Sequence, residues 1–126
     1  MNGRKRRIEV LIVDDGEYIR EVISYVLNDN GFITESASNG EEALKKVAQN
    51  KPDIIILDIM MPQMNGLQVC KRLRENPATQ DIPIIFLSAQ ERIEQPIQDM
   101  PGAPIKYIEK PCDLEYLLSQ INSLVS

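Results

Sequence analysis

The hydrophobic positions of the chain form short, dense runs that alternate with stretches of wider spacing. Mostly apolar runs rich in Ile, Val and Leu occur at residues 8–13, 54–57, 84–87 and 105–108, and a weaker one occurs at 32–37. Runs of this length, apolar at successive positions, are typical of strands that are buried on both faces of a sheet. The pattern therefore predicts five strands.

Apolar residues recur at helical spacing between and after these runs, which predicts four helices. The predicted helices are one striped from Tyr18 to Leu27 and ended by Gly31, one striped from Ala43 to Ala48 and opened by Ser38 or Asn39, one from about Gly66 to Glu75, and one striped from Leu114 to Val125. Strands that alternate with helices predict an α/β fold, a doubly wound parallel sheet with helices on both faces. Ligands of such sheets bind beyond the carboxyl ends of the strands.

Length and charge limit the classes of function. The 126 residues suffice for one domain with its own core, and we expect residues 1–126 to form that domain, without an output domain. The 14 basic and 19 acidic residues give a net charge of -5, which argues against nucleic-acid binding as the main activity. The basic cluster Arg4–Arg7 is interpreted as part of a solvated N-terminal tail, residues 1–7, in preference to a docking patch.

No apolar run approaches the length of a membrane span. Glu9 and Asp14 interrupt the apolar stretch that a secretory signal would need after the basic cluster. The sequence therefore predicts a cytoplasmic location and no membrane partner.

The chain has no histidine and two cysteines. The first fact excludes metal sites built on imidazole, Ser-His-Asp catalysis and histidine bases. Cys70 lies among apolar residues of a predicted helix and is interpreted as a small core residue. Cys112 lies at a predicted helix start, where a thiol can be activated, but a structural role is favoured there as well.

Polar side chains follow four of the predicted strands at the point where each strand ends. Asp14 and Asp15 follow the first, Asp58 the third, Ser88 the fourth and Lys110 the fifth. Three carboxylates gathered at one sheet edge would repel one another by about 4 kcal/mol per pair at ~4 Å and an effective dielectric of 20, so a cation is needed. Because the available ligands are oxygens, the best candidates are Mg²⁺ and Mn²⁺.

A carboxylate beside such a metal ion has two plausible uses. Asp58 could hold the ion for another reaction, or it could attack phosphorus itself and form an acyl phosphate. Lys110 and Ser88 favour the second use, because an ammonium group and a hydroxyl would bind the phosphoryl oxygens that the metal leaves free.

Four stretches of the chain resemble the receiver domains of two-component response regulators, in the order and spacing of that family. They are "VLIVDD", "IIILDIMMPQMNG", "PIIFLSA" and "YIEKP". The resemblance covers nearly the whole chain and is closest in kind to chemotaxis receivers. It implies a flavodoxin-like sheet with the strand order 2-1-3-4-5.

The resemblance also implies roles for the acids. It makes Asp58 the phosphorylated residue and a metal ligand, with Asp14 and Asp15 as the acidic pair of the Mg²⁺ site. The main-chain carbonyl of Met60 would be a further ligand.

Other residues match positions that act on the phosphoryl group or respond to it. In the family pattern Ser88 and Lys110 contact the phosphoryl oxygens, and Ser88 and the aromatic Tyr107 change position as the switch. Met60 and Gln90 occupy the places that tune hydrolysis of the phosphorylated form.

Prolines near the end of the chain carry two further expectations. The family holds the Lys110–Pro111 bond in the cis form, which costs an X–Pro bond only about 0.5 to 1 kcal/mol. In the segment expected to hold the family's fourth helix, Pro96 would break a continuous helix at a cost of about 3 kcal/mol. We therefore expect a short helix from about Pro96 to Pro101, preceded by a loop or separate turn at residues 89–95.

The resemblance implies a phosphorylation-controlled signalling switch that is not an enzyme for outside substrates. The chain would catalyse its own phosphorylation from a histidine kinase, a phosphotransfer protein or a small acyl phosphate, and it would lose the group by hydrolysis. A downstream protein or a missing output domain would read the state. The alternative is a degenerate receiver that binds partners without phosphorylation. A haloacid-dehalogenase-type phosphatase would need an acid where Met60 stands, and a flavin carrier would need a phosphate-binding loop where "DDGEY" stands.

Overall fold

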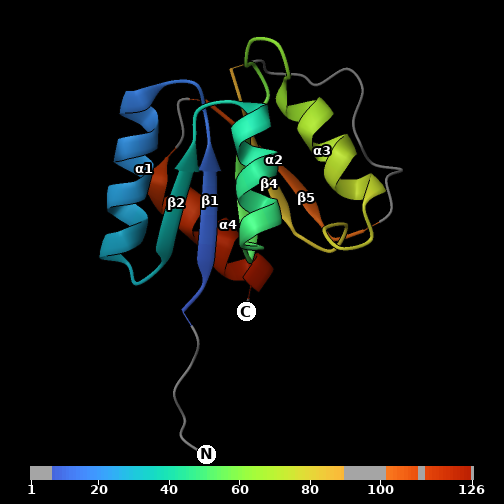
Figure 1. The fold of residues 1–126 in the computed structure, drawn as a ribbon. Helices are drawn as coiled ribbons and strands as arrows, with labels where there is room; N and C mark the ends of the chain where they lie inside the picture. The colour runs from blue at the N-terminus through green and yellow to red at the C-terminus, as the bar shows by residue number, and fades with distance from the viewer. Residues whose placement is uncertain (1–6, 90–101, 111–112, 126) are drawn as a thin grey trace, which may run out of the picture.

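A computed structural model of the chain describes residues 7–89, 102–110 and 113–125. Their elements are, in chain order, β1 (Glu9–Val13), α1 (Glu17–Asp29), β2 (Ile33–Ala37), α2 (Gly40–Gln49), β3 (Ile54–Asp58), α3 (Gly66–Glu75), β4 (Ile84–Ser88), β5 (Ile105–Glu109) and α4 (Leu114–Val125). All neighbouring strands are parallel, in the order β2-β1-β3-β4-β5 (Figure 1). The predicted fold class and strand order are confirmed, as are the four helices predicted from apolar residues at helical spacing.

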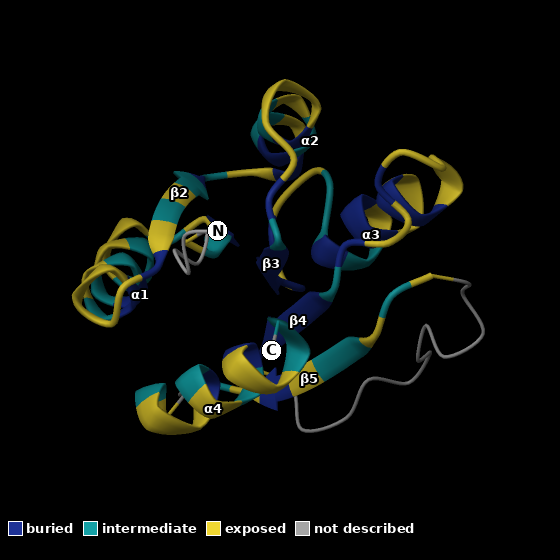
Figure 2. Ribbon diagram, turned by 90° about the horizontal axis from the view of Figure 1, so that it is seen from below, coloured by how far each residue is buried: buried dark blue, intermediate teal, exposed yellow. Residues whose placement is uncertain are grey.

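Helices cover both faces of the sheet, with α1 and α4 on one side and α2 and α3 on the other (Figure 2). Successive strand residues therefore enter different cores. Ile54 and Ile56 pack with α1 and α4, whereas Ile55 and Leu57 pack with α2 and α3. Strands β3 and β4 are buried along their whole length, which confirms the two-sided burial predicted from their apolar runs. Each such Ile or Leu contributes about 1.5–3 kcal/mol when fully buried.

Side chains at the helix starts explain where two of the helices begin. Of the two residues predicted to open α2, Asn39 is the N-cap, because its side chain accepts a hydrogen bond from Glu42 N at 2.8 Å. Helix α3 begins with a reciprocal capping box between Asn65 and Gln68. Helix α1 begins after Gly16, which provides no side-chain cap.

Arg74 of α3 ties that helix to the beginnings of two strands. The residue is buried, its Nη1 donates to the Ile82 carbonyl at 2.8 Å, and its Nη2 donates to the Ala103 carbonyl at 3.1 Å. Gly102 has φ +121°, and a Cβ there would lie 2.2 Å from the Gln80 carbonyl oxygen. Any other residue at position 102 would therefore displace the backbone.

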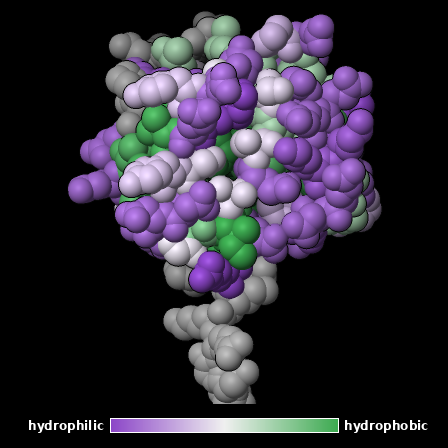
Figure 3. Space-filling view, turned by 60° about the vertical axis from the view of Figure 1, so that its left-hand side comes forward, coloured by the Kyte–Doolittle hydropathy of each residue, from purple (hydrophilic) through white to green (hydrophobic). Residues whose placement is uncertain are grey.

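The surface around α1 and β2 is mainly hydrophilic, with smaller groups of hydrophobic side chains between (Figure 3). Tyr18 and Tyr25 of α1 and Ile33 of β2 are among its exposed large residues. Cys70 is fully buried, as predicted, and burial raises the pKa of its thiol to about 11, so the thiol stays protonated near neutral pH. No helix in the described part of the chain is long and apolar enough to cross a membrane.

Several predictions concern residues outside the described ranges. They are the tail at residues 1–6, the role of Gln90, the short helix from Pro96 to Pro101, the cis bond before Pro111 and the surroundings of Cys112.

Candidate functional site

The strand register brings polar residues from distant parts of the sequence to one edge of the sheet. Val13 pairs with Leu57, so the residues that follow them, Asp14 and Asp58, lie at the ends of adjacent strands. Asp58 in turn pairs with Leu87, the residue before Ser88. The convergence therefore follows from parallel strands that end at the same level.

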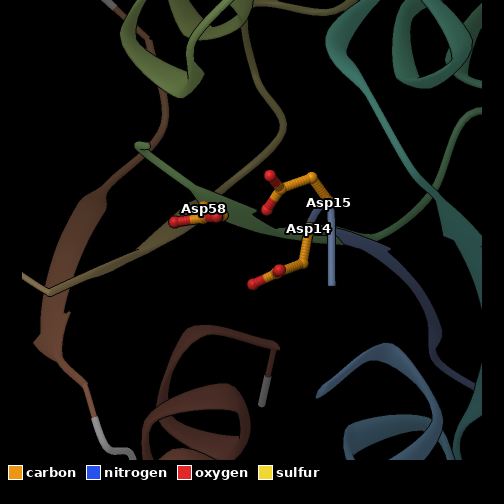
Figure 4. A group of neighbouring side chains, drawn as sticks. All are labelled: Asp14, Asp15 and Asp58. Carbon is orange, nitrogen blue, oxygen red and sulfur yellow. The ribbon is translucent and has the colours of Figure 1, made fainter. Parts of the chain in front are cut away.

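Three carboxylates turn toward a common space at this edge (Figure 4). One oxygen from each of Asp14, Asp15 and Asp58 lies within 4.8 Å of the others. Asp14 and Asp58 are each only 2% exposed, whereas Asp15 is exposed. The cluster thus combines two acids that are buried with one that is exposed to solvent.

Lys110 supplies the positive charge nearest to the buried acids. Its Nζ lies 2.8 Å from Asp14 Oδ2 and 3.4 Å from Asp58 Oδ1. Burial is the largest single influence on the pKa of Lys110 and lowers it, but the hydrogen bond and charge of Asp14, together with the charge of Asp58, raise it more. The pKa therefore lies above its usual value, and the ammonium form persists at neutral pH.

Asp58 is less acidic than an ordinary aspartate. Burial raises its pKa most, and the charge of Asp14 raises it further, while Lys110 and a hydrogen bond from Met60 N offset part of the effect. The Met60 N–H donates to Asp58 Oδ1 at 3.2 Å. A carboxylate that binds a proton more tightly is also a more basic nucleophile, and a cation beside it would favour its ionised form.

The start of α3, after the loop that follows Asp58, is packed against the backbone at the end of β3. Gly66 N donates to the Ile59 carbonyl at 3.0 Å, and a Cβ on Gly66 would lie 2.3 Å from the Asp58 carbonyl oxygen. Only glycine fits this approach without displacing the backbone. The Met60 side chain is 53% exposed beside the site, while Ile59 and Met61 are buried.

Ser88 and Tyr107 occupy different positions relative to the carboxylates. Ser88 is 3% exposed at the end of β4, and its carbonyl accepts a hydrogen bond from Lys110 N at 2.7 Å. Tyr107 lies on β5, two residues before Glu109, the residue that pairs with Ser88. Its ring stacks on Phe86 with a centroid distance of 5.3 Å and an interplanar angle of 20°. Its side chain is 36% exposed. The aromatic residue therefore stands outside the group of acids.

Arg20 is a residue of this edge that the sequence reasoning missed. Its Nη1 donates to the Asp14 main-chain carbonyl at 2.7 Å. The available signal was a basic residue one turn after Gly16, at the start of a helix that is otherwise acidic there. That position alone does not reveal a contact with a main-chain carbonyl six residues earlier, before the helix begins.

The donor set fits a hard divalent cation. The three carboxylates supply oxygen ligands within one small space, and neither histidine nor cysteine belongs to the cluster. Mg²⁺ binds few protein carboxylates and keeps several waters, which suits a cluster with two buried acids and one acid open to solvent. In the described part of the chain, the Asp15 carboxylate accepts no hydrogen bond that would compete with a metal ion.

The sheet order and the polar edge together define the class of chemotaxis-type receivers with a flavodoxin-like fold. Residues 10–122 match the family model of the response regulator receiver domain, and the chain belongs to that family. Receivers of this kind are signalling modules of two-component systems that work with histidine kinases and output domains.

Similar proteins come from several organisms. The response regulator MprA of Mycobacterium sp. (strain KMS) is 36% identical over 118 residues, which cover 94% of this chain and 50% of that protein. The chain spans about half the length of the curated relatives it matches. Chemotaxis protein CheY4 of Vibrio cholerae superposes with a TM-score of 0.83 at 32% identity, covering 94% of this chain and 99% of that one. A putative response regulator from Chloroflexus aurantiacus J-10-fl gives a TM-score of 0.85 at 34% identity, covering 95% and 98%.

Proposed function

We propose that this receiver is a phosphorylation-controlled switch that accepts a phosphoryl group on Asp58 in a Mg²⁺-dependent reaction. The observation that carries the proposal is the surroundings of Asp58. This buried carboxylate has a raised pKa and lies 3.4 Å from the Lys110 ammonium group. One of its oxygens lies within 4.8 Å of an oxygen of each of two further acids. An acid kept only for stability would have partners of opposite charge and no additional acids.

In the proposed reaction an Asp58 carboxylate oxygen attacks the phosphorus of the donor. The new O–P bond forms as the donor's P–N bond breaks, if the donor is a phosphohistidine, or as its P–O bond breaks, if it is an acyl phosphate. The electron pair leaves with the imidazole or the carboxylate. A bound Mg²⁺ would supply positive charge to the phosphoryl oxygens, held by Asp14, Asp15, Asp58 and the Met60 carbonyl.

The remaining polar residues of the edge would act on the oxygens that the metal leaves free. The Lys110 ammonium would donate to one of them, and the Ser88 hydroxyl would donate to another. The phosphoryl group would later be lost to water, at a rate tuned by the residues at 60 and 90. Repositioning of Ser88 and Tyr107 would then report the phosphorylation state to a partner.

The proposed donor is a histidine kinase or a phosphotransfer protein in the cytoplasm. The reader is a downstream protein or an output domain. The net charge of -5 gives this domain no general attraction to nucleic acid. A receiver that works without phosphorylation has no support from the site, because each acid, the hydroxyl and the lysine are retained.

The test is the intact mass of the protein after incubation with acetyl phosphate and Mg²⁺. We expect the wild-type protein to gain one phosphoryl mass and Asp58→Asn to gain none. Asp81→Asn, which changes an exposed aspartate just before the start of β4, at the opposite end of that strand from the site, is the matched control and should be labelled like the wild type. Labelling of Asp58→Asn, or undiminished labelling of the wild type in excess chelator, would contradict the proposal.

A further inference from the structure

Arg20 holds the loop that carries the acidic pair. Its Nη1 donates to the Asp14 carbonyl at 2.7 Å, and its main-chain N donates to the Gly16 carbonyl at 3.2 Å. The same loop is tied by Gly16 N, which donates to Asp14 Oδ1 at 2.8 Å, and by Asp14 N, which donates to the Ala37 carbonyl at 3.2 Å. Arg20 brings its charged group to the main chain of the loop, whereas Lys110 contacts the Asp14 side chain, at 2.8 Å.

The guanidinium group also lies within electrostatic reach of the start of α2. Glu42 accepts hydrogen bonds from Ser38 N at 2.6 Å and from Ser38 Oγ at 3.2 Å. The hydrogen bond from Ser38 N is the largest cause that lowers the pKa of Glu42, and the charges of Lys46 and Arg20 add to it. Arg20 therefore stands between the β1–α1 loop and the β2–α2 loop.

The carbonyl that Arg20 binds belongs to the peptide unit between Asp14 and Asp15. Holding this peptide plane places the Asp15 main-chain N and so restricts the directions in which the Asp15 side chain can leave the backbone. Within the described ranges, the Asp15 carboxylate accepts no hydrogen bond of its own, and it is exposed. Its place beside Asp58 thus depends on the backbone, and the backbone depends in part on Arg20.

We propose that Arg20 is a positioning residue of the metal site: it orients the Asp14–Asp15 peptide so that Asp15 faces a divalent cation shared with Asp58. The inference rests on the proposed Mg²⁺-dependent function. A charged hydrogen bond to a main-chain carbonyl behind a ligand is the kind of support that orients metal ligands, and its loss typically costs about 10- to 100-fold in metal affinity.

The first measurement is the Mg²⁺ dissociation constant of the unphosphorylated protein by calorimetric titration. We expect Arg20→Met to weaken binding about 10-fold and Arg20→Lys, which keeps the charge and one donor, to fall between it and the wild type. Arg72→Met is the matched control, since Arg72 is an exposed residue of α3. Arg20→Gln, which keeps an N–H donor without the charge, takes the place of Arg20→Met if that variant does not fold.

A double-mutant cycle with Asp15→Asn separates this role from a merely structural one. If Arg20 acts through Asp15, removing Arg20 in the Asp15→Asn background should weaken Mg²⁺ binding by less than 2-fold. In acetyl phosphate labelling, the half-saturating Mg²⁺ concentration should rise in Arg20→Met while the rate at saturating Mg²⁺ stays near that of the wild type.

Three results would decide against the inference or against its premise. Wild-type Mg²⁺ affinity in Arg20→Met, or full additivity with Asp15→Asn, would overturn the role of Arg20 and leave the proposed function standing. A wild-type protein that binds no Mg²⁺ at millimolar concentration would instead overturn the proposed function.

Discussion

Replacing Asp58 by asparagine should make the metal-free protein more stable. The substitution keeps the shape of the side chain and removes one of three acids that share the edge of the sheet. A site selected for chemistry is expected to carry such a cost, because a nucleophilic carboxylate has to be held close to the metal ligands that repel it.

The size of the effect follows from the distances. Two ionised carboxylates whose oxygens lie within 4.8 Å of each other repel by at least about 3 kcal/mol at an effective dielectric of 20. Asp58 has two such neighbours, and against them it has the attraction of Lys110 at 3.4 Å, about 5 kcal/mol on the same scale. Screening at the exposed Asp15 reduces the repulsion, while relief from burying a charge adds to the gain. We expect a net stabilisation of about 1–3 kcal/mol at pH 7 and low salt.

The gain should depend on pH in a defined direction. Because the pKa of Asp58 is raised in the folded protein, mainly by burial, its protonated form contributes stability that is fully present below the usual value of 3.8 and is lost as the pH rises through the raised value. Asparagine does not titrate. The advantage of Asp58→Asn should therefore be smallest at and below pH 3.8 and should grow to a plateau above the raised pKa.

Urea unfolding in EDTA across this pH range measures the difference, with thermal unfolding as a second readout at about 4 °C per kcal/mol for a domain of this size. Mg²⁺ should stabilise the wild type more than the variant and so narrow the gap. Asp81→Asn, which loses an exposed ion pair with Lys51, should show no such pH dependence. A variant less stable than the wild type at neutral pH without metal would refute the reasoning.

Three further substitutions test the packing and charge balance around the site. Gly66→Ala should lower the unfolding free energy by about 1–3 kcal/mol and slow labelling of Asp58, because the added Cβ would collide with the Asp58 carbonyl oxygen. The control is Gly16→Ala, whose added Cβ has contacts no closer than 3.3 Å and which should change the free energy measured by urea unfolding much less. Arg74→Met should cost about 2–3 kcal/mol in the same assay, because two main-chain carbonyls at the beginnings of β4 and β5 lose their donor; unchanged stability would contradict this. Lys110→Met should destabilise the protein by about 2 kcal/mol at pH 7. Since the pKa of Lys110 is raised in the folded protein, the stability difference should persist below pH 10.5 and vanish as the pH rises through the raised pKa. A stability difference that stays constant in alkaline unfolding experiments would contradict this prediction.

The fold was predictable because the strands are apolar on both faces and the helices are striped on one. The run from Ile54 to Leu57 is short, apolar and rich in β-branched residues, which favours a strand between two helical layers, and a parallel sheet places its carboxyl ends at one edge. The meeting of Asp14, Asp58 and Lys110 followed from that topology, since each is the last residue of a strand or directly follows one. Strand ends are visible in a sequence because hydrophobicity stops there.

Contacts that depend on side-chain reach were not predictable in the same way. Arg20 binds a carbonyl six residues earlier, and Arg74 binds one 29 residues later. Neither contact has a periodic pattern that sequence reasoning could use, because a long flexible side chain can satisfy many main-chain groups. The close approach of Gly66 to the Asp58 carbonyl was not predicted, since the distance between two backbones depends on packing that no local pattern encodes.

The position of Lys110 suggests how phosphorylation of Asp58 would affect the ends of β4 and β5. The ammonium now lies closer to Asp14 than to Asp58, at 2.8 Å against 3.4 Å. Phosphorylation would increase the negative charge at Asp58 to about −1.5 to −2, and this charge would draw Lys110 toward Asp58. The main-chain N of Lys110 donates a hydrogen bond to the Ser88 carbonyl, so this shift would also displace the ends of β4 and β5, which that hydrogen bond connects. Phe86 and Tyr107 stack on each other on these strands, two residues before Ser88 and Glu109, and Tyr107 is partly exposed. In the proposed switch, a movement of the strand ends would therefore be passed to Tyr107 and change the surface that a partner binds.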